Sequence, residues 1–183
     1  MHDDSIDHQP HIVVREGGPA DFDRYFDEGF AALSSVSRHF RFFTAVRELP
    51  PPLREKLRNI DGVVNGAVIA FDEAVDLPDH PEGRPIGVAR WMGGEDGPPE
   101  LSITVVDDYQ GMGVGIRMMD ALLDLARERG IHQIILDVLR ENTGMRTLVN
   151  KYRATVLRSG DPLVVRYRID VVPPIVAPVL PPL

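Results

Sequence analysis

The chain has 183 residues, of which 43% are hydrophobic, and its 28 acidic and 20 basic residues give a formal net charge of −8. This length and composition predict one compact domain with a sizeable core. The acidic balance argues against a protein that binds nucleic acid through clustered Lys and Arg, and the absence of cysteine excludes disulfides, thiolate metal sites and a cysteine nucleophile.

The two ends of the chain differ in composition from the residues between them. Residues 1–10 are polar and acidic, unlike a signal peptide, and predict a disordered lead-in. Residues 171–183 form an apolar tail whose prolines prevent a helix or an interior strand. Such a tail could dock on a neighbouring subunit, so both a monomer and a homodimer remain possible. No apolar run approaches the roughly 20 residues that span a bilayer. We therefore expect residues 11–170 to form one cytoplasmic domain that contacts neither a membrane nor nucleic acid.

The first half of the chain predicts a strand, three helices and a pair of strands. Apolar residues recur at helical spacing in the three helical segments, and the serines that open the second are interpreted as caps. A charged loop containing proline separates the last two strands, a spacing that predicts an antiparallel pair. The predicted elements are a strand at 11–16, helices at 21–33, 34–43 and 53–60, and strands at 63–71 and 85–92.

The second half alternates strands with helices. A helix with an amphipathic pattern is expected to end at Gly130, because glycine is the preferred residue just after a helix. Apolar strands on both sides of this helix predict a mixed α/β sheet. The predicted elements are strands at 100–106, 132–139, 154–158 and 163–170, and helices at 113–129 and 142–151.

The segment VVDDYQGMGVG, residues 105–115, ends a strand and opens a helix, with glycines at 111, 113 and 115. The first amides of a helix have no intrahelical partner and carry partial positive charge, and glycine lets a phosphate approach the backbone closely. The spacing fits neither the dinucleotide fingerprint, which needs glycine where Ile116 stands, nor the P-loop, which needs Lys followed by Ser or Thr. We interpret the segment as a pyrophosphate site of another kind; the alternative is a tight turn without a ligand.

Three segments resemble the GNAT superfamily of N-acetyltransferases. Gln110-x-x-Gly113-x-Gly115 is similar to its acyl-CoA pyrophosphate signature Q/R-x-x-G-x-G/A, and ENTGMRTLVNKY resembles its later helix, which begins with Asn and commonly carries E-N-x-x-M. FAALSSVSRHFRFF is similar to the L-S-x-x-S-x-x-x-R-F-F segment of the branch that contains the bacterial Pat-type protein-lysine acetyltransferases. The resemblance covers residues 11–170. It implies an α/β fold with a mixed, mostly antiparallel central sheet of six to seven strands flanked by helices.

The resemblance implies acetyl-CoA as the acyl donor. The backbone of Ile103 and Val105 would pair with the pantetheine arm as a neighbouring strand would, and the amides of residues 111–116 would hold the pyrophosphate, with Gln110 shaping the turn. The side chain of Asn142 would contact the pantetheine or its diphosphate end, and it is also a good N-cap. The implied donor-binding residues are Ile103, Val105, Gln110, Gly111, Met112, Gly113, Val114, Gly115, Ile116 and Asn142.

Acetyl transfer to an amine needs a base, because a lysine with a pKa near 10.4 is almost wholly protonated at pH 7 and an ammonium has no lone pair. In the Pat-type branch a glutamate ten residues before the signature glutamine is the general base, and the resemblance implies this role for Glu100, relayed through water. The alternative is an exposed acid at the start of a strand. Glu95 and Asp96 are loop acids with weaker claims. Asp107 and Asp108 are interpreted as turn residues that bond local backbone.

The chain departs from the family pattern near the thiolate leaving group. Many members have a tyrosine that protonates the thiolate where this chain has Val149, and Tyr152 could substitute for it, although a packed aromatic is the favoured interpretation. Arg153 and Ala154 replace the usual G-F ending of this helix. The six histidines show no metal-ligand spacing, so no metal is expected.

The leading hypothesis is an N-acetyltransferase that moves an acetyl group from acetyl-CoA to a primary amine by direct attack, with Glu100 as the base and a protein lysine as the preferred acceptor. Two alternatives stay open. One is a small-molecule amine acetyltransferase, and the other is a non-catalytic acyl-CoA-binding module that kept the GNAT fold.

Overall fold

The computed structural model describes residues 9–44, 46–94 and 97–171. The predicted lead-in up to residue 8, the tail from residue 172, and the loop acids Glu95 and Asp96 lie outside the described residues. Within these ranges no helix is long and apolar enough to cross a membrane.

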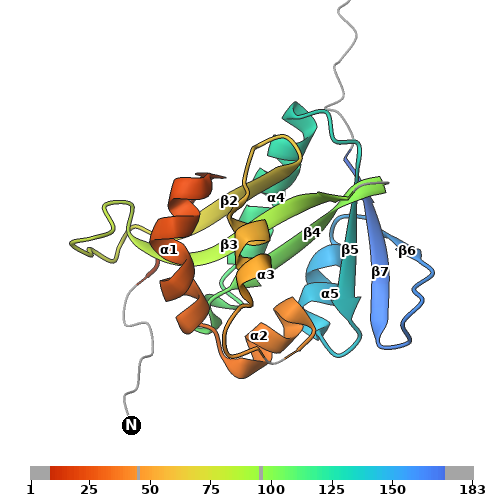
Figure 1. Ribbon diagram of the computed structural model, residues 1–183, viewed down its shortest axis with the longest axis horizontal. Coiled ribbons are helices and arrows are strands. Elements are labelled where there is room, and N and C mark those ends of the chain that lie inside the picture. The colour runs from red at the N-terminus through yellow and green to blue at the C-terminus, as the bar shows by residue number, and fades with distance from the viewer. Residues whose placement is uncertain (1–8, 45, 95–96, 172–183) are drawn as a thin grey trace, which may run out of the picture.

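One mixed sheet forms the centre of the molecule (Figure 1). Within the described residues its seven strands lie in the order β1-β2-β3-β4-β5-β7-β6, and only the central pair, β4 and β5, is parallel. This confirms the predicted mostly antiparallel α/β sheet of the GNAT type. The strands are β1 (Ile12–Gly17), β2 (Asn65–Asp72), β3 (Arg84–Gly94), β4 (Gly97–Val105), β5 (Gln133–Leu139), β6 (Thr155–Leu157) and β7 (Val164–Asp170).

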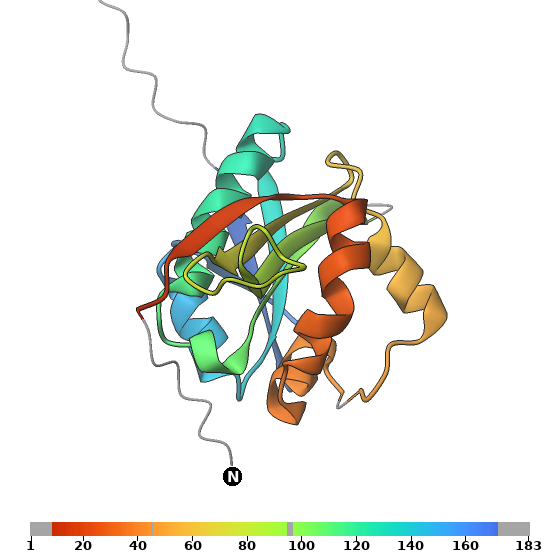
Figure 2. The same ribbon diagram turned by 90° about the vertical axis from the view of Figure 1, so that its left-hand side faces the viewer.

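Helices cover both faces of the sheet. Figure 2 shows α4 on one side of strands β2 to β4 and α1 and α3 on the other. The helices are α1 (Pro19–Ala31), α2 (Ser35–Phe42), α3 (Pro51–Arg58), α4 (Val114–Glu128) and α5 (Thr143–Asn150), with a short 3-10 turn, η1 (Asp107–Tyr109), before α4.

The main core lies between α4 and the sheet. Met118, Met119 and Leu122 of α4 are fully buried, as are Trp91 of β3 and Leu136 of β5. Burying a side chain of this size contributes about 1.5–3 kcal/mol. A second cluster, centred on Phe22, Leu57, Ile60 and Ala67, joins α1 and α3 to the opposite face.

All predicted helices and strands are present, with differences at their ends. Strand β4 begins at Gly97, before the predicted start, because the hairpin with β3 continues to the pair Gly94 and Gly97. Helix α4 ends at Glu128, one residue before the predicted end, and Gly130 just beyond it lies in the left-handed region at φ +73°. Ser34 caps α2 as expected, since its side chain accepts a hydrogen bond from the amide of Ser37.

The chain leaves α5 through a left-handed arginine. Arg153 has φ +51° and an exposed side chain. A left-handed L-residue costs roughly 1–2 kcal/mol, and glycine removes this cost while increasing the entropy of the unfolded chain. We therefore expect Arg153→Gly to raise the free energy of unfolding by about 0.5–1 kcal/mol in urea titrations. Arg158→Gly, at an exposed position without a positive φ, is the control, and a loss of stability in Arg153→Gly would contradict the prediction.

Candidate active site

Strands β4 and β5 separate at their carboxyl ends (Figure 1). Their only register pair joins Glu100 to Ile135, although β4 continues to Val105 and β5 to Leu139. On its other edge β4 stays paired with β3, where Ala89 lies opposite Ile103. Among the described residues, the edge of β4 beyond Glu100 therefore has no paired strand on the β5 side, and Ile103 and Val105 lie on this part of β4.

The glycine turn follows the open end of β4. Gly111 and Gly113 have φ values of +77° and +83°, and a Cβ on either would meet no protein atom within 4 Å. Within the described residues, no backbone acceptor bonds to the amides of residues 111–115, whereas the amide of Ile116 donates to the carbonyl of Gly113 at 3.1 Å. Unpaired amides in front of open space at a helix N-terminus form a cradle for an anion.

The side chain of Gln110 holds the turn in place. Its Nε2 donates to the carbonyl of Val105 and to Oγ of Ser37, each at 3.1 Å. These bonds tie the turn to the end of β4 and to α2. The prediction that Gln110 shapes the turn is consistent with this geometry.

Asp107 also connects the turn to α2. Its carboxylate accepts from the amide of Ser34 at 2.9 Å and from the hydroxyls of Ser34 and Ser37 at 2.6 and 2.9 Å. Burial raises the pKa of Asp107, but these hydrogen bonds outweigh burial and leave that pKa below its usual value. We expected Asp107 to bond local backbone. Its own backbone does contribute to the lowered pKa. Its carboxylate also bonds Ser34 and Ser37, far away along the chain, because packing brings the start of α2 against η1.

A buried hydrogen bond between Tyr109 and Asp72 ties the segment before the glycine turn to β2. The hydroxyl of Tyr109 donates to Oδ2 of Asp72 at 3.0 Å, and the exposed fractions of the two residues are 1% and 0%. The same carboxylate accepts from the amides of His11 and Ala74. Burial and the bond to Asp72 raise the pKa of Tyr109 to about 12, so its hydroxyl keeps its proton at neutral pH. The pair joins β2 to the segment that carries the glycines.

Removing this hydroxyl is expected to cost stability. Tyr109→Phe takes one donor from a buried carboxylate, and such a loss costs about 1–2 kcal/mol in the free energy of unfolding. Urea titration measures the loss. Tyr167→Phe is the control, because Tyr167 is also buried but its hydroxyl makes no hydrogen bond within the described residues. Equal stability of the two variants would show that the Asp72 bond contributes little.

Glu100 lies at the point where β4 and β5 separate, with an exposed side chain. The charge of Glu100 acts to raise the pKa of two arginines, Arg41 and Arg166. Burial lowers the pKa of Arg41, on α2, to about 10, and Glu100 opposes that shift. Hydrogen bonds to Asp137, and to a smaller extent the charge of Glu100, raise the pKa of Arg166 on β7. Both arginines therefore lie within electrostatic range of the Glu100 carboxylate.

Asn142 lies at the start of α5, shortly after the end of β5. Its Oδ1 accepts from the amide of Met145 at 2.9 Å, so it is the N-cap of this helix. Its Nδ2 has no hydrogen-bond partner in the described part of the chain. The preceding Glu141 bonds Nε2 of His39 at 2.9 Å and so links α2 to the loop after β5. The sequence offered no signal for this link.

The positions that depart from the family pattern do not present a free acid. Val149 is fully buried. The hydroxyl of Tyr152 lies 2.7 Å from Oδ1 of Asp120, and burial together with this bond raises the pKa of Tyr152. The hydroxyl proton of Tyr152 is therefore engaged in a hydrogen bond to Asp120 of α4, and the ring packs against the core. Arg117 of α4 donates to the carbonyl of Ile12 at 2.9 Å.

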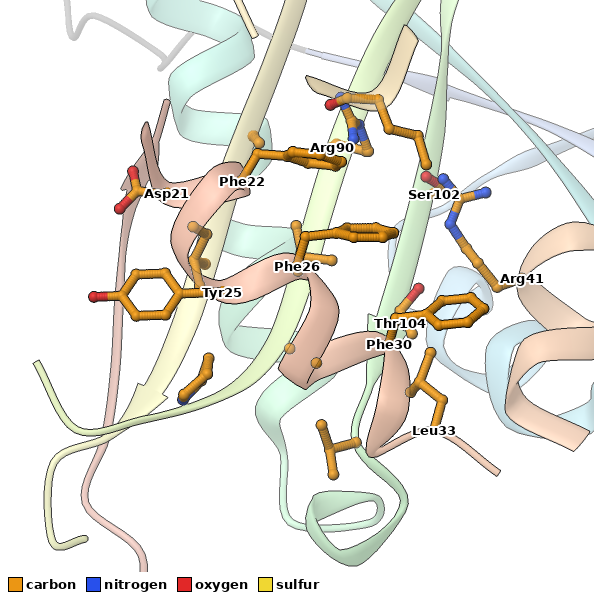
Figure 3. Close-up of a pocket in the computed structure, with 18 of the residues that line it drawn as sticks. Asp21, Phe22, Tyr25, Phe26, Phe30, Leu33, Arg41, Arg90, Ser102 and Thr104 are labelled. Carbon is orange, nitrogen blue, oxygen red and sulfur yellow. The ribbon is translucent and has the colours of Figure 1, made fainter. Parts of the chain in front are cut away.

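A pocket of about 110 Å³ lies between α1 and the face of the sheet that carries Glu100 (Figure 3). Aromatic side chains of α1 form one wall, and Ser102 and Thr104 of β4 lie on the opposite side. Arg41 and Arg90 both line this pocket. Neither arginine was among the predicted site residues, although Arg90 is the one charged residue in the predicted strand at 85–92. Across the described residues there is no group of three or more metal-ligating side chains.

Comparisons with known proteins agree with this geometry. The profile of the Acetyltransferase (GNAT) family matches residues 38–152. Acetyltransferase PA5475 of Pseudomonas aeruginosa is 32% identical over 146 residues, which are 79% of this chain and 75% of that protein. Acetyltransferase Pat of Mycolicibacterium smegmatis is 38% identical over 74 residues, which are 40% of this chain but 22% of that protein.

A solved structure has the same fold. The crystal structure of the GNAT domain of S. lividans PAT aligns with a TM-score of 0.72 and 24% identity, covering 86% of this chain and 89% of that one. Together with the family profile and the relative from Pseudomonas, this fold settles the classification. The chain belongs to the GNAT family of acetyltransferases.

Proposed function

We propose that the protein is an N-acetyltransferase that moves the acetyl group of acetyl-CoA to a primary amine, with Glu100 as the general base and a protein lysine as the preferred acceptor. The observation that carries the proposal is the separation of β4 and β5 directly after Glu100, with a glycine turn of unpaired amides at the end of β4. Acetyl-CoA supplies the acetyl group as a thioester. The turn suits its pyrophosphate, and the open edge of β4 suits its pantetheine arm.

The base has to act on the acceptor before attack. Glu100, directly or through a water, takes a proton from the ammonium, and the neutral nitrogen then attacks the thioester carbonyl carbon. A backbone amide of β4 that donates to the carbonyl oxygen would stabilise the negative charge that develops there. The C–N bond forms, the attacking nitrogen loses its second proton to solvent, the C–S bond breaks, and the departing thiolate takes up a proton from solvent. No protein acid is assigned to the thiolate, because Val149 has no proton to give and the Tyr152 hydroxyl is bonded to Asp120.

The protein-lysine acceptor rests on likeness to Pat. The segment shared with acetyltransferase Pat of Mycolicibacterium smegmatis supports an acceptor of this class, and the S. lividans domain adds likeness of fold alone. A small amine is the alternative acceptor.

Two measurements test the proposed donor and the proposed acceptor in turn. We expect CoA and acetyl-CoA, but not NAD, to raise the melting temperature, because a ligand that binds only the folded state stabilises it. Release of free thiol is then measured with a lysine-containing protein, lysine peptides and free polyamines. Turnover with polyamines alone would refute the protein-lysine acceptor. Binding of acetyl-CoA without transfer to any amine would favour an acyl-CoA-binding module.

A further inference from the structure

The pocket beneath α1 holds an arginine whose charge is incompletely matched. Arg90 is 5% exposed, and its Nη2 donates to the carbonyl of Leu57 at 2.7 Å. Its Nε is buried and, among the described residues, has no hydrogen-bond partner. A buried charged group without full pairing is costly, so such an atom indicates a missing acceptor.

A second arginine enters the same pocket from α2. Figure 3 shows Arg41 extending toward Ser102, on the side of the pocket where Arg90 lies. Arg41 is half-buried, its guanidinium lies 4.9 Å from the ring centre of Phe42, and no carboxylate in the described part of the chain bonds to it. Burial, followed by the charge of Arg41, lowers the pKa of Arg90 to about 10. The two guanidinium groups therefore repel each other across the pocket.

The rest of the pocket is apolar. Phe22, Phe26 and Phe30 form a row along α1, with ring centres 4.4 and 5.8 Å apart, and Phe42 continues it at 6.0 Å from Phe30. A ligand for this pocket therefore needs an anionic group for the arginines and an apolar part for the aromatic row. A carboxylate suits the charged part, because guanidinium groups bind it through paired, charge-assisted hydrogen bonds.

The charged part of the pocket is close to the candidate base. Glu100, Ser102 and Thr104 alternate along β4 and so share one face of the sheet. Arg90 lies directly opposite Ser102 on β3, which makes Glu100 its diagonal neighbour, roughly 7–8 Å away between Cα atoms. A carboxylate beside Arg90 and an amine beside Glu100 can therefore belong to one molecule.

We infer that this pocket binds a carboxylate of the acceptor between Arg41 and Arg90, so that the enzyme prefers amines that carry a carboxylate close in space to the reacting nitrogen. The inference rests on the proposed function, since it names a property of the same acceptor. The carboxylate has two sources: a small amino acid, or an acidic side chain beside an acceptor lysine.

Matched acceptors test the inference and separate the two sources. The small pair is 5-aminopentanoate and 5-aminopentanamide, and the peptide pair carries Glu or Gln beside one lysine. We expect at least a tenfold higher kcat/KM for the acid of one pair, and the pair that shows it identifies the source. Equal rates within both pairs would overturn the inference while leaving the acetyltransferase function intact.

Variants link the preference to the arginines. Arg41→Met and Arg90→Met are each expected to raise KM for the acid at least tenfold, with little change for the amide or for acetyl-CoA. Arg41→Met is the less disruptive variant for the fold, because Arg41 makes no hydrogen bond in the described part of the chain, whereas Arg90 bonds the carbonyl of Leu57. Arg129→Met is the control, since it removes an arginine at the far end of α4. An acid preference that survives both pocket variants would overturn the inference.

A binding measurement separates failure of the inference from failure of the function. Pentanoate has no amine, so its stabilisation of the folded protein does not depend on catalysis. We expect pentanoate to raise the melting temperature of the wild type and of Arg129→Met, but not of Arg41→Met. This pattern without acetyl transfer to any amine would support the pocket and refute the proposed function. Absence of stabilisation in the wild type would count against the pocket.

Discussion

Glu100→Gln is expected to lower kcat/KM for the amine at pH 7 by a factor of about 10²–10⁴, the usual contribution of a positioned general base, which is about 3–5 kcal/mol. Glutamine has nearly the same shape but cannot take a proton from the ammonium. The dissociation constant of acetyl-CoA is expected to change little, because the glycine turn and the open edge of β4 are left intact. Free-thiol release and calorimetry measure the two quantities.

The pH profile distinguishes loss of a base from a structural defect. Without Glu100 the rate should depend on the fraction of acceptor that is already neutral, which rises tenfold per pH unit below the amine pKa of about 10.4. The variant should therefore approach the wild type as the pH increases. Glu128→Gln, an exposed acid on α4, is the control. Unchanged activity in Glu100→Gln would remove Glu100 from the role of base.

Gly113→Ala is expected to raise the dissociation constant of acetyl-CoA by about 10- to 100-fold, or about 1.4–2.7 kcal/mol. Gly113 has φ +83° at the start of α4, where an L-residue costs roughly 1–2 kcal/mol. The open space in front of its Cα is also where a phosphate would approach the amides, and a methyl group there would push it away. Isothermal calorimetry measures the change.

Gly130→Ala is a matched control for backbone strain. Gly130 has φ +73° just after the same helix and also has open space around its Cα. Both variants should lose a similar amount of stability, but only Gly113→Ala should lose affinity for acetyl-CoA. If both variants bind acetyl-CoA equally well, the turn does not hold the pyrophosphate.

The helices and strands could be predicted because their signals are local. The helical spacing of apolar residues in α4 and Gly130 just beyond it predicted its position, since both depend on contacts within a few turns. The serines before α2 predicted a cap, which Ser34 provides. The glycine turn was predicted as an anion site for the same reason, because its unpaired amides follow from a strand that runs directly into a helix.

The long-range hydrogen bonds that hold the site together could not be predicted in this way. Oδ2 of Asp72 and the hydroxyl of Tyr109 are 37 positions apart, and His39 and Glu141 are 102 apart. No short-range pattern relates such residues. Asp107 illustrates the difficulty, because its sequence neighbourhood suggests a local turn while its partners belong to α2.

The sequence by itself determined the order of elements, the glycine turn and the family, because periodicity, capping and short motifs act between residues a few positions apart. Only the tertiary structure decided which charged groups meet. Arg90 faces the pocket because β3 pairs with β4 in one register, which puts it opposite Ser102, and a shift of one residue would turn it to the other face. Arg41 reaches the same pocket because α2 is held against the glycine turn by Asp107 and Gln110. Strand register and helix docking depend on the whole core, so the pocket that we assign to the acceptor emerges only when the chain is folded.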